Sequence, residues 1–96
     1  MAGKVHGKIT ACSEAGDLLT DITAAQLVDA PRDERVSVSA GGHQTIGIHG
    51  PDHSEPEMTF LALLSPDDGL RLTIVGDSAR IMLGLRAGEE VVVEWQ

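Results

Sequence analysis

The stretch RVSVSAGGHQTIGI, residues 35–48, decides the fold class of this chain. Residues 35–40 alternate between two kinds of side chain, and residues 43–48 alternate again. A period of two is typical of a strand with one buried face. Gly41 and Gly42 form a permissive two-residue link between the runs, as in a tight hairpin. The stretch therefore predicts a pair of antiparallel strands.

Similar strand-like runs lie on both sides of this hairpin. They are residues 4–13, 18–22, 58–64, 70–75 and 90–95. Turn-forming residues around Gly16 separate the first two runs, and the segment 65–69 separates the next two. Two further hairpins are therefore expected, with Gly7 at a bend in the first strand.

Two short segments have the composition of helical inserts. Thr23 precedes residues 24–28, which are good helix formers, and Ser78 precedes residues 79–83 as a possible N-cap. Together with about seven strand-like runs, these inserts predict an all-β fold, a small antiparallel β-barrel. Crossover helices of a βαβ fold would be longer. The length of 96 residues predicts a single domain, residues 1–96.

Composition disfavours several classes of partner. The formal net charge is -8, and aromatic residues make up only 2% of the chain. An acidic surface repels phosphate backbones and anionic lipids, so we expect neither nucleic acid nor membrane as a partner. Cys12 is the only cysteine, and no apolar run resembles a signal peptide or membrane span. We therefore expect a cytoplasmic protein.

A weak metal-site candidate lies in the polar loop after residue 48. His49, His53 and Glu55 offer imidazole and carboxylate ligands. A proline-containing loop lacks the regular geometry of a metal-binding helix. We therefore expect a solvated loop without metal, and keep a small metal-binding protein as a third hypothesis.

Several segments, in their order along the chain, resemble one family. These segments are Gly7-Lys8-Ile9 to Thr20-Asp21-Ile22, residues 60–65 with 69–72, Gly76-Asp77-Ser78-Ala79 to Leu83-Gly84-Leu85, and residues 88–91. They resemble the C-terminal β-barrel domain of the S-adenosylmethionine hydroxide adenosyltransferases, the family that contains the fluorinating and chlorinating enzymes. In that family a larger α/β domain precedes the barrel, and S-adenosylmethionine lies between that domain and a neighbouring barrel of a trimer. The larger domain has no counterpart in these residues.

The resemblance also implies a set of ligand-binding positions. The family reads roughly Phe-Gly-Asn and then Thr-Asn-Ile where this chain has Ala15-Gly16-Asp17 and Thr20-Asp21-Ile22. A later Asn-Ala motif corresponds to Asp77, Ser78 and Ala79. Ala15 lacks a ring on which adenine could rest, and the Asp17 carboxylate only accepts hydrogen bonds. These residues are therefore expected to form a vestigial site.

The first functional hypothesis is a non-catalytic binding or assembly module. It needs no cofactor, although the resemblance implies S-adenosylmethionine or adenosine as the small molecule to test. The second is one subunit of a split adenosyltransferase that a separate α/β chain completes. A protein partner and self-association are both open, as is the oligomeric state. The turns at Ala15–Asp17 and Asp77–Ala79 should share a cleft if a small molecule still binds.

Overall fold

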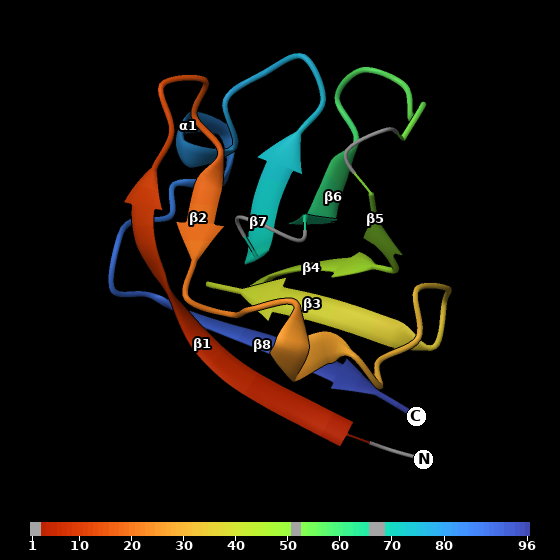
Figure 1. The fold of residues 1–96 in the computed structure, drawn as a ribbon. Helices are drawn as coiled ribbons and strands as arrows, with labels where there is room; N and C mark the ends of the chain where they lie inside the picture. The colour runs from red at the N-terminus through yellow and green to blue at the C-terminus, as the bar shows by residue number, and fades with distance from the viewer. Residues whose placement is uncertain (1–2, 51–52, 66–68) are drawn as a thin grey trace.

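The computed structural model describes residues 3–50, 53–65 and 69–96, which fold mainly as strands (Figure 1). The strands are β1 (Gly3–Cys12), β2 (Leu18–Thr20), β3 (Val36–Ala40), β4 (His43–Ile46), β5 (Ile48–His49), β6 (Phe60–Ser65), β7 (Gly69–Ile74) and β8 (Glu90–Trp95). The helical elements are a 3-10 turn, η1 (Ala25–Leu27), and a short helix, α1 (Ala79–Leu83). The all-β fold class expected from sequence is confirmed. None of the helices in this part of the chain has the length and apolar character needed to cross a bilayer.

The strands form one eight-stranded sheet that curls into a nearly closed barrel. Their order is β4-β3-β8-β1-β2-β7-β6-β5. Neighbouring strands are antiparallel, except that β5 and β6 run parallel. The two end strands, β4 and β5, follow each other in the chain. The Thr45 hydroxyl donates to the Phe60 carbonyl over 2.9 Å, and this bond links β4 to β6.

Gly47 accounts for the eighth strand, where about seven were expected. Residues 43–48 were expected as a single strand, but the backbone bends sharply at Gly47, which has a φ of 86°. Its N–H donates to the Val36 carbonyl over 2.9 Å, and the Ile48 N–H then donates to the Arg32 carbonyl. Because of this bend, the chain leaves β3 as its neighbour and pairs with β6.

Both expected helical inserts are present, and only the first is shorter than expected. The first is only the three-residue turn η1. The Thr23 N–H, just before this turn, donates a hydrogen bond to the Gln26 side chain within it. The second is α1, in which the Ser78 hydroxyl accepts a hydrogen bond from the Ile81 N–H at 3.3 Å. Gly84 ends α1 in the left-handed conformation.

The long strand β1 has a different neighbour on each part of its length. Its first part, from Gly3 to Lys8, pairs with β8, whereas its last part, from Ile9 to Cys12, pairs with β2. Gly7, where a bend was expected, lies inside the β8 pairing, and the register of β1 becomes irregular only later, between Ile9 and Ala11. A Cβ atom at Gly7 would overlap the Ile22 side chain, so the glycine permits a close approach.

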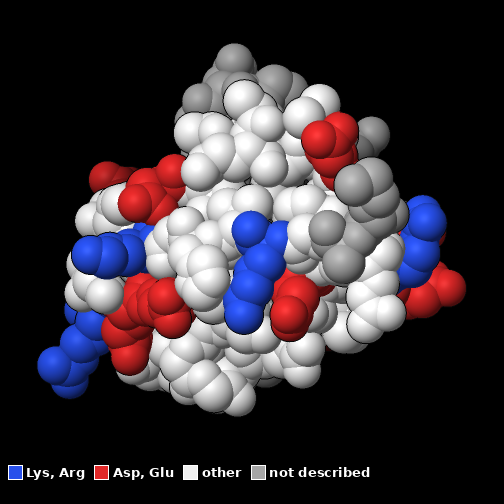
Figure 2. Space-filling model, turned by 90° about the horizontal axis from the view of Figure 1, so that it is seen from below, with Lys and Arg blue, Asp and Glu red and all other residues white. Residues whose placement is uncertain are grey.

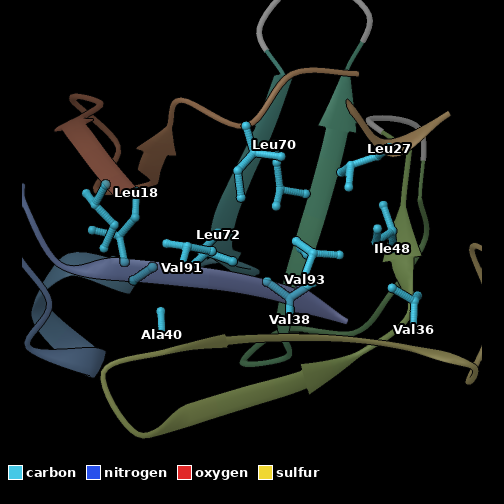
Figure 3. Close-up of a cluster of buried hydrophobic side chains, with 14 of the residues drawn as sticks. Leu18, Leu27, Val36, Val38, Ala40, Ile48, Leu70, Leu72, Val91 and Val93 are labelled. Atoms are coloured by element: carbon cyan, nitrogen blue, oxygen red, sulfur yellow. The ribbon is translucent and has the colours of Figure 1, made fainter. Parts of the chain in front are cut away.

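Aliphatic side chains fill the interior of the barrel (Figure 3). Buried residues shown there include Leu18, Leu27, Val36, Val38, Ile48, Leu70, Leu72, Val91 and Val93. Trp95 is 9% exposed and packs at the end of this core over Gly3. The single tryptophan therefore closes the core rather than standing free on the surface.

Candidate functional site

The turn after β1 and the turn after β7 line the same hollow. It has a volume of about 550 Å³. Among the described residues, its wall consists of Ala15, Asp17, His53, Leu63, Thr73, Ile74, Val75, Gly76, Asp77 and Ser78. Four of the six ligand-binding candidates, Ala15, Asp17, Asp77 and Ser78, therefore lie on one hollow, which is the arrangement that small-molecule binding at these turns would require.

The β1–β2 turn is held in place by its own backbone and by α1. The Gly16 N–H donates to the Ser13 carbonyl, and the Asp17 N–H donates to the Ser13 hydroxyl over 3.1 Å. The Gly16 carbonyl accepts a hydrogen bond from the Arg80 N–H at 2.9 Å. Gly16 has a φ of 91° and lies so close to Ser78 that a Cβ atom would overlap the Ser78 hydroxyl. The two turns are thus in direct contact.

The Asp17 carboxylate fastens this turn to β7. Its Oδ1 accepts a hydrogen bond from the Thr73 hydroxyl at 2.5 Å, and its Oδ2 lies 3.3 Å from Nη1 of Arg71. The side chain of Asp17 is only 16% exposed. A charge-assisted network of this kind orients the carboxylate firmly and uses both of its oxygens. Asp17 therefore has a structural partner on each oxygen.

The second turn also uses its polar groups within the fold. Oδ1 of Asp77 accepts a hydrogen bond from the Ser78 N–H at 2.7 Å, and the Ser78 hydroxyl caps α1. His53 reaches the wall from the loop after β5, and its Nδ1 accepts a hydrogen bond from the Glu55 N–H at 3.2 Å. The apolar side chains Leu63, Ile74 and Val75 complete the wall. The hollow thus combines apolar surface with polar groups that already have partners.

Two ligand-binding candidates lie away from the hollow surface. Ala79 is completely buried and belongs to the core. Asp21 is exposed, and its carboxylate accepts a hydrogen bond from the Lys8 N–H at 2.8 Å. The Asp21 N–H donates to the Lys8 carbonyl, so this residue ends the β1–β2 pairing.

The sequence did not point to Arg71, Thr73 or His53 as neighbours of these turns. Arg71 and Thr73 are two residues apart on β7, so both side chains lie on the same face. Their polar character on an otherwise apolar strand was the available signal. Nothing in the local sequence indicated that Asp17 would be their partner. Asp17 is 54 residues from Arg71 and 56 residues from Thr73 in the chain.

The weak metal candidates form a loose group near the end of β5. Nδ1 of His49 lies 3.6 Å from Oε1 of Glu55, and the rings of His49 and His53 are 6.3 Å apart, centre to centre. Within residues 3–50, 53–65 and 69–96, no three His, Cys, Asp or Glu side chains gather as a metal-holding group. These contacts organise the loop.

An exposed ion pair lies outside the hollow, immediately before β3. Nε of Arg35 is 3.0 Å from Oδ1 of Asp33. The side-chain hydrogen bond from Arg35 holds the pKa of the Asp33 carboxyl below its ordinary value, and the same bond raises the pKa of Arg35. The same carboxylate oxygen also accepts a hydrogen bond from the Arg35 N–H at 3.0 Å, so the pair belongs to the turn that leads into β3.

A larger and open hollow of about 900 Å³ lies over β3, β4 and β8. Ser37, Ile46 and Glu94 are among its lining residues, together with Lys4 and Arg35. Lys4 and Arg35 already have carboxylate neighbours. Figure 2 shows acidic and basic side chains interspersed on one face of the molecule, without a broad surface of one sign.

Comparison with known proteins identifies the fold but no family. No protein-family model matches the chain, and no curated protein matches its sequence. An uncharacterized conserved protein from Thermotoga maritima has a similar fold, with a TM-score of 0.74 and 15% identity over 92% of this chain and 35% of that chain. A conserved hypothetical protein from Thermus thermophilus is also similar, with a TM-score of 0.66 and 20% identity over 92% of this chain and 34% of that one. The chain therefore spans about a third of the length of these two proteins.

Proposed function

We propose that this chain is a non-catalytic β-barrel binding or assembly module, related to the C-terminal barrel of the S-adenosylmethionine hydroxide adenosyltransferases. One observation carries the proposal. The two turns that correspond to the family's adenosyl-binding motifs line one hollow, and the polar side chains on its wall are bonded within the fold. These polar side chains support the fold, so the hollow is better suited to binding than to catalysis.

The chemistry of the wall supports a non-catalytic role. A general base must reach the proton that it removes, and a displacement reaction needs a positioned nucleophile in a dry site. Asp17 instead bonds to Thr73 and Arg71, and the Ser78 hydroxyl caps α1. Freeing either group would cost hydrogen bonds that hold the turns together.

The adenosyl-binding positions also differ from the family in ways that weaken nucleoside recognition. Ala15 is exposed on the rim and provides no ring for stacking. Each oxygen of the Asp17 carboxylate already contacts a partner within the fold, Thr73 on Oδ1 and Arg71 on Oδ2. A nucleoside would therefore find apolar contacts but few free donors or acceptors from these two residues.

Assembly with a further domain or chain is supported by the structural neighbours. In both proteins, the region similar to this chain makes up about a third of the length. The hollow is open to the surface, so residues of a further domain or chain would reach its wall. This observation also favours the second candidate function, in which this chain is one half of a split adenosyltransferase.

The first experiment measures turnover. Purified protein is incubated with S-adenosylmethionine, and nucleosides are separated by liquid chromatography. We expect no more adenosine than in a protein-free sample. Adenosine release that scales with protein concentration would overturn the non-catalytic proposal. Release that requires an added α/β adenosyltransferase domain would instead support the split-enzyme alternative.

The second experiment tests the vestigial site by restoring the family's residues. Adenosine is titrated into the 15N-labelled protein and into the variant Ala15→Phe/Asp17→Asn. We expect affinity at least about tenfold higher for the variant, because it regains a ring and an amide. Glu14→Phe, which adds a ring one position earlier, is the matched control and should not bind more tightly. Equal affinity for all three proteins would contradict the proposal that the hollow corresponds to the adenosyl-binding site of the family.

A further inference from the structure

The first half of β1 is a free edge of the sheet. β8 is its neighbour on one side, whereas β2 pairs only from Ile9 onward. On the other side of Gly3–Gly7, no strand pairs with β1 in the part of the chain that the structure describes. In Figure 1 this half of β1 runs along the lower margin of the molecule. A free edge presents backbone groups that another strand can bind.

The hydrogen bonds at Lys8 and Ile9 show which backbone groups face the free side. The Ile9 N–H donates toward β8, to the Glu89 carbonyl. The Lys8 N–H points the other way and donates to Asp21. Because successive residues of a strand alternate, the N–H and C=O groups of Lys4 and His6 also point away from β8. Those four groups have no hydrogen-bond partner among the described residues.

Three cationic or ionisable basic side chains line the outward face of this edge. Lys4, His6 and Lys8 are all exposed and lie on the same face of β1. The protein itself displays a matching strand, because Glu94 and Glu90 of β8 lie opposite Lys4 and Lys8. Nζ of Lys4 is 4.0 Å from Glu94, and Nδ1 of His6 is 3.0 Å from Glu90. An acidic strand on the free side would repeat this arrangement.

The same charges disfavour a second copy of the chain on this edge. An antiparallel β1–β1 pair centred on His6 would place Lys4 opposite Lys8 of the other copy. Like charges directly opposite one another destabilise a sheet. Lysines on an edge strand therefore discourage self-pairing but permit an acidic partner.

We propose that the Gly3–Gly7 edge of β1 binds an extended acidic segment of a partner protein by strand addition. Backbone bonds to Lys4 and His6 would supply the affinity, and carboxylates opposite Lys4 and Lys8 would supply the selectivity. This interface lies away from the hollow and does not depend on adenosyl chemistry. It extends the proposed assembly role by naming where a partner binds and what charge it carries.

The test uses two short peptides with capped ends. The acidic peptide is Ser-Glu-Thr-Val-Thr-Glu-Ser, which repeats on one face the order of Glu90, Val92 and Glu94. The control peptide has lysine in place of both glutamates. In titrations of 15N-labelled protein, we expect the acidic peptide to shift β1 resonances and to bind at least about tenfold more tightly than the control. Affinity for the acidic peptide should fall as salt is added.

A proline variant tests the backbone contribution. His6→Pro removes an N–H that does not face β8, and proline is tolerated at such edge positions. His6→Ala is the matched control, since it loses the same imidazole but keeps the N–H. We expect His6→Pro to bind the acidic peptide at least about tenfold more weakly than His6→Ala, because a ladder hydrogen bond is lost.

A second variant keeps the test decisive if His6→Pro does not fold. Lys4→Gln/Lys8→Gln leaves the backbone unchanged and should reduce the preference between the two peptides to about threefold or less. Equal binding of both peptides by the natural protein would overturn the proposal. Shifts confined to Ala15, Asp17 and Ser78 would also overturn it, and would place binding at the hollow instead. A concentration-dependent dimer that His6→Ala retains and His6→Pro abolishes would show that a second copy occupies the edge.

Discussion

Gly16 is the residue that brings the two turns of the hollow into contact. Its φ of 91° lies in the region that favours glycine, and its missing side chain leaves room for the Ser78 hydroxyl. Its carbonyl also accepts the hydrogen bond from Arg80 in α1. A single glycine therefore fixes both the shape of the turn and its distance from α1.

Replacing this glycine should separate the effect of backbone strain from that of crowding. Gly88 also has a positive φ, of 98°, but a Cβ atom there would meet nothing within 4 Å. We expect Gly88→Ala to lower the free energy of unfolding by about 1 kcal/mol, from backbone strain alone. Gly16→Ala should cost about 1–3 kcal/mol more, because the new methyl group meets Ser78. Urea denaturation of both variants measures the difference, and equal losses would contradict the crowding at Gly16.

The Asp17 carboxylate provides a second prediction at this scale. Asp17→Asn keeps an oxygen for Thr73 but loses the ion pair with Arg71, so a loss of about 1 kcal/mol in unfolding free energy is expected. Asp17→Ala leaves both partners without this acceptor and should cost about 2–3 kcal/mol. Thermal or urea unfolding checks the order of the two variants. The reverse order would mean that the network does not support the turn.

The sequence pointed to individual residues of the hollow only where they belong to a motif of the resembled family. Ala15, Asp17, Asp77 and Ser78, which the family motifs marked, line one hollow. Ala79 instead is the buried residue of α1 and belongs to the core. The partners of Asp17 come from β7, and contacts between distant segments leave little mark in a local pattern.

At the scale of elements, β1 contributes to two pairings and changes partner along its length. Its last residues pair with β2, and its first residues have β8 on one side only. Alternation of side chains along β1 was visible in the sequence. The change of partner was not, because the same period of two fits any antiparallel neighbour.

Hydrogen exchange of the free protein tests the orientation of this edge. Backbone N–H groups of Val5 and Gly7 face β8 and should exchange slowly. Those of Lys4 and His6 face the free side and should exchange at least about tenfold faster. Residue-resolved exchange measured by NMR gives the comparison directly. Uniform protection along Lys4–Gly7 would show that another segment covers the edge.

The break at Gly47 shows how tertiary structure overrides a regular pattern. Residues 43–48 alternate without interruption in sequence, yet β4 pairs with β3 and β5 pairs with β6. Glycine within a strand is a signal for a bulge or sharp bend. The signal gives no direction for the bend, which depends on β6 being available as a neighbour.

At the scale of the whole molecule, an aliphatic core with one buried tryptophan holds the barrel together. Trp95 is 9% exposed and lies at the end of β8, next to β1 and β3. A small domain with one continuous core generally unfolds in a single cooperative step. The fluorescence of Trp95 should therefore report the unfolding of the entire barrel.

This expectation can be checked with two probes of the same transition. In urea, the midpoint from Trp95 fluorescence should agree with the midpoint from far-ultraviolet circular dichroism. The emission of the folded protein should lie at shorter wavelength than that of the unfolded chain, because folding removes the ring from water. Separate midpoints would show that the barrel does not unfold in a single cooperative step.

The sequence by itself determined the all-β class and the three hairpins, because alternation of side chains is a local property with a period of two. Tertiary structure alone decided which strands become neighbours at the ends of β1 and at Gly47. It also decided that Asp17 bonds to β7 and that the edge at Lys4 and His6 stays open. Each of these features depends on contacts between segments that are far apart in the chain. Such contacts form, and contribute to stability, only when the barrel has folded.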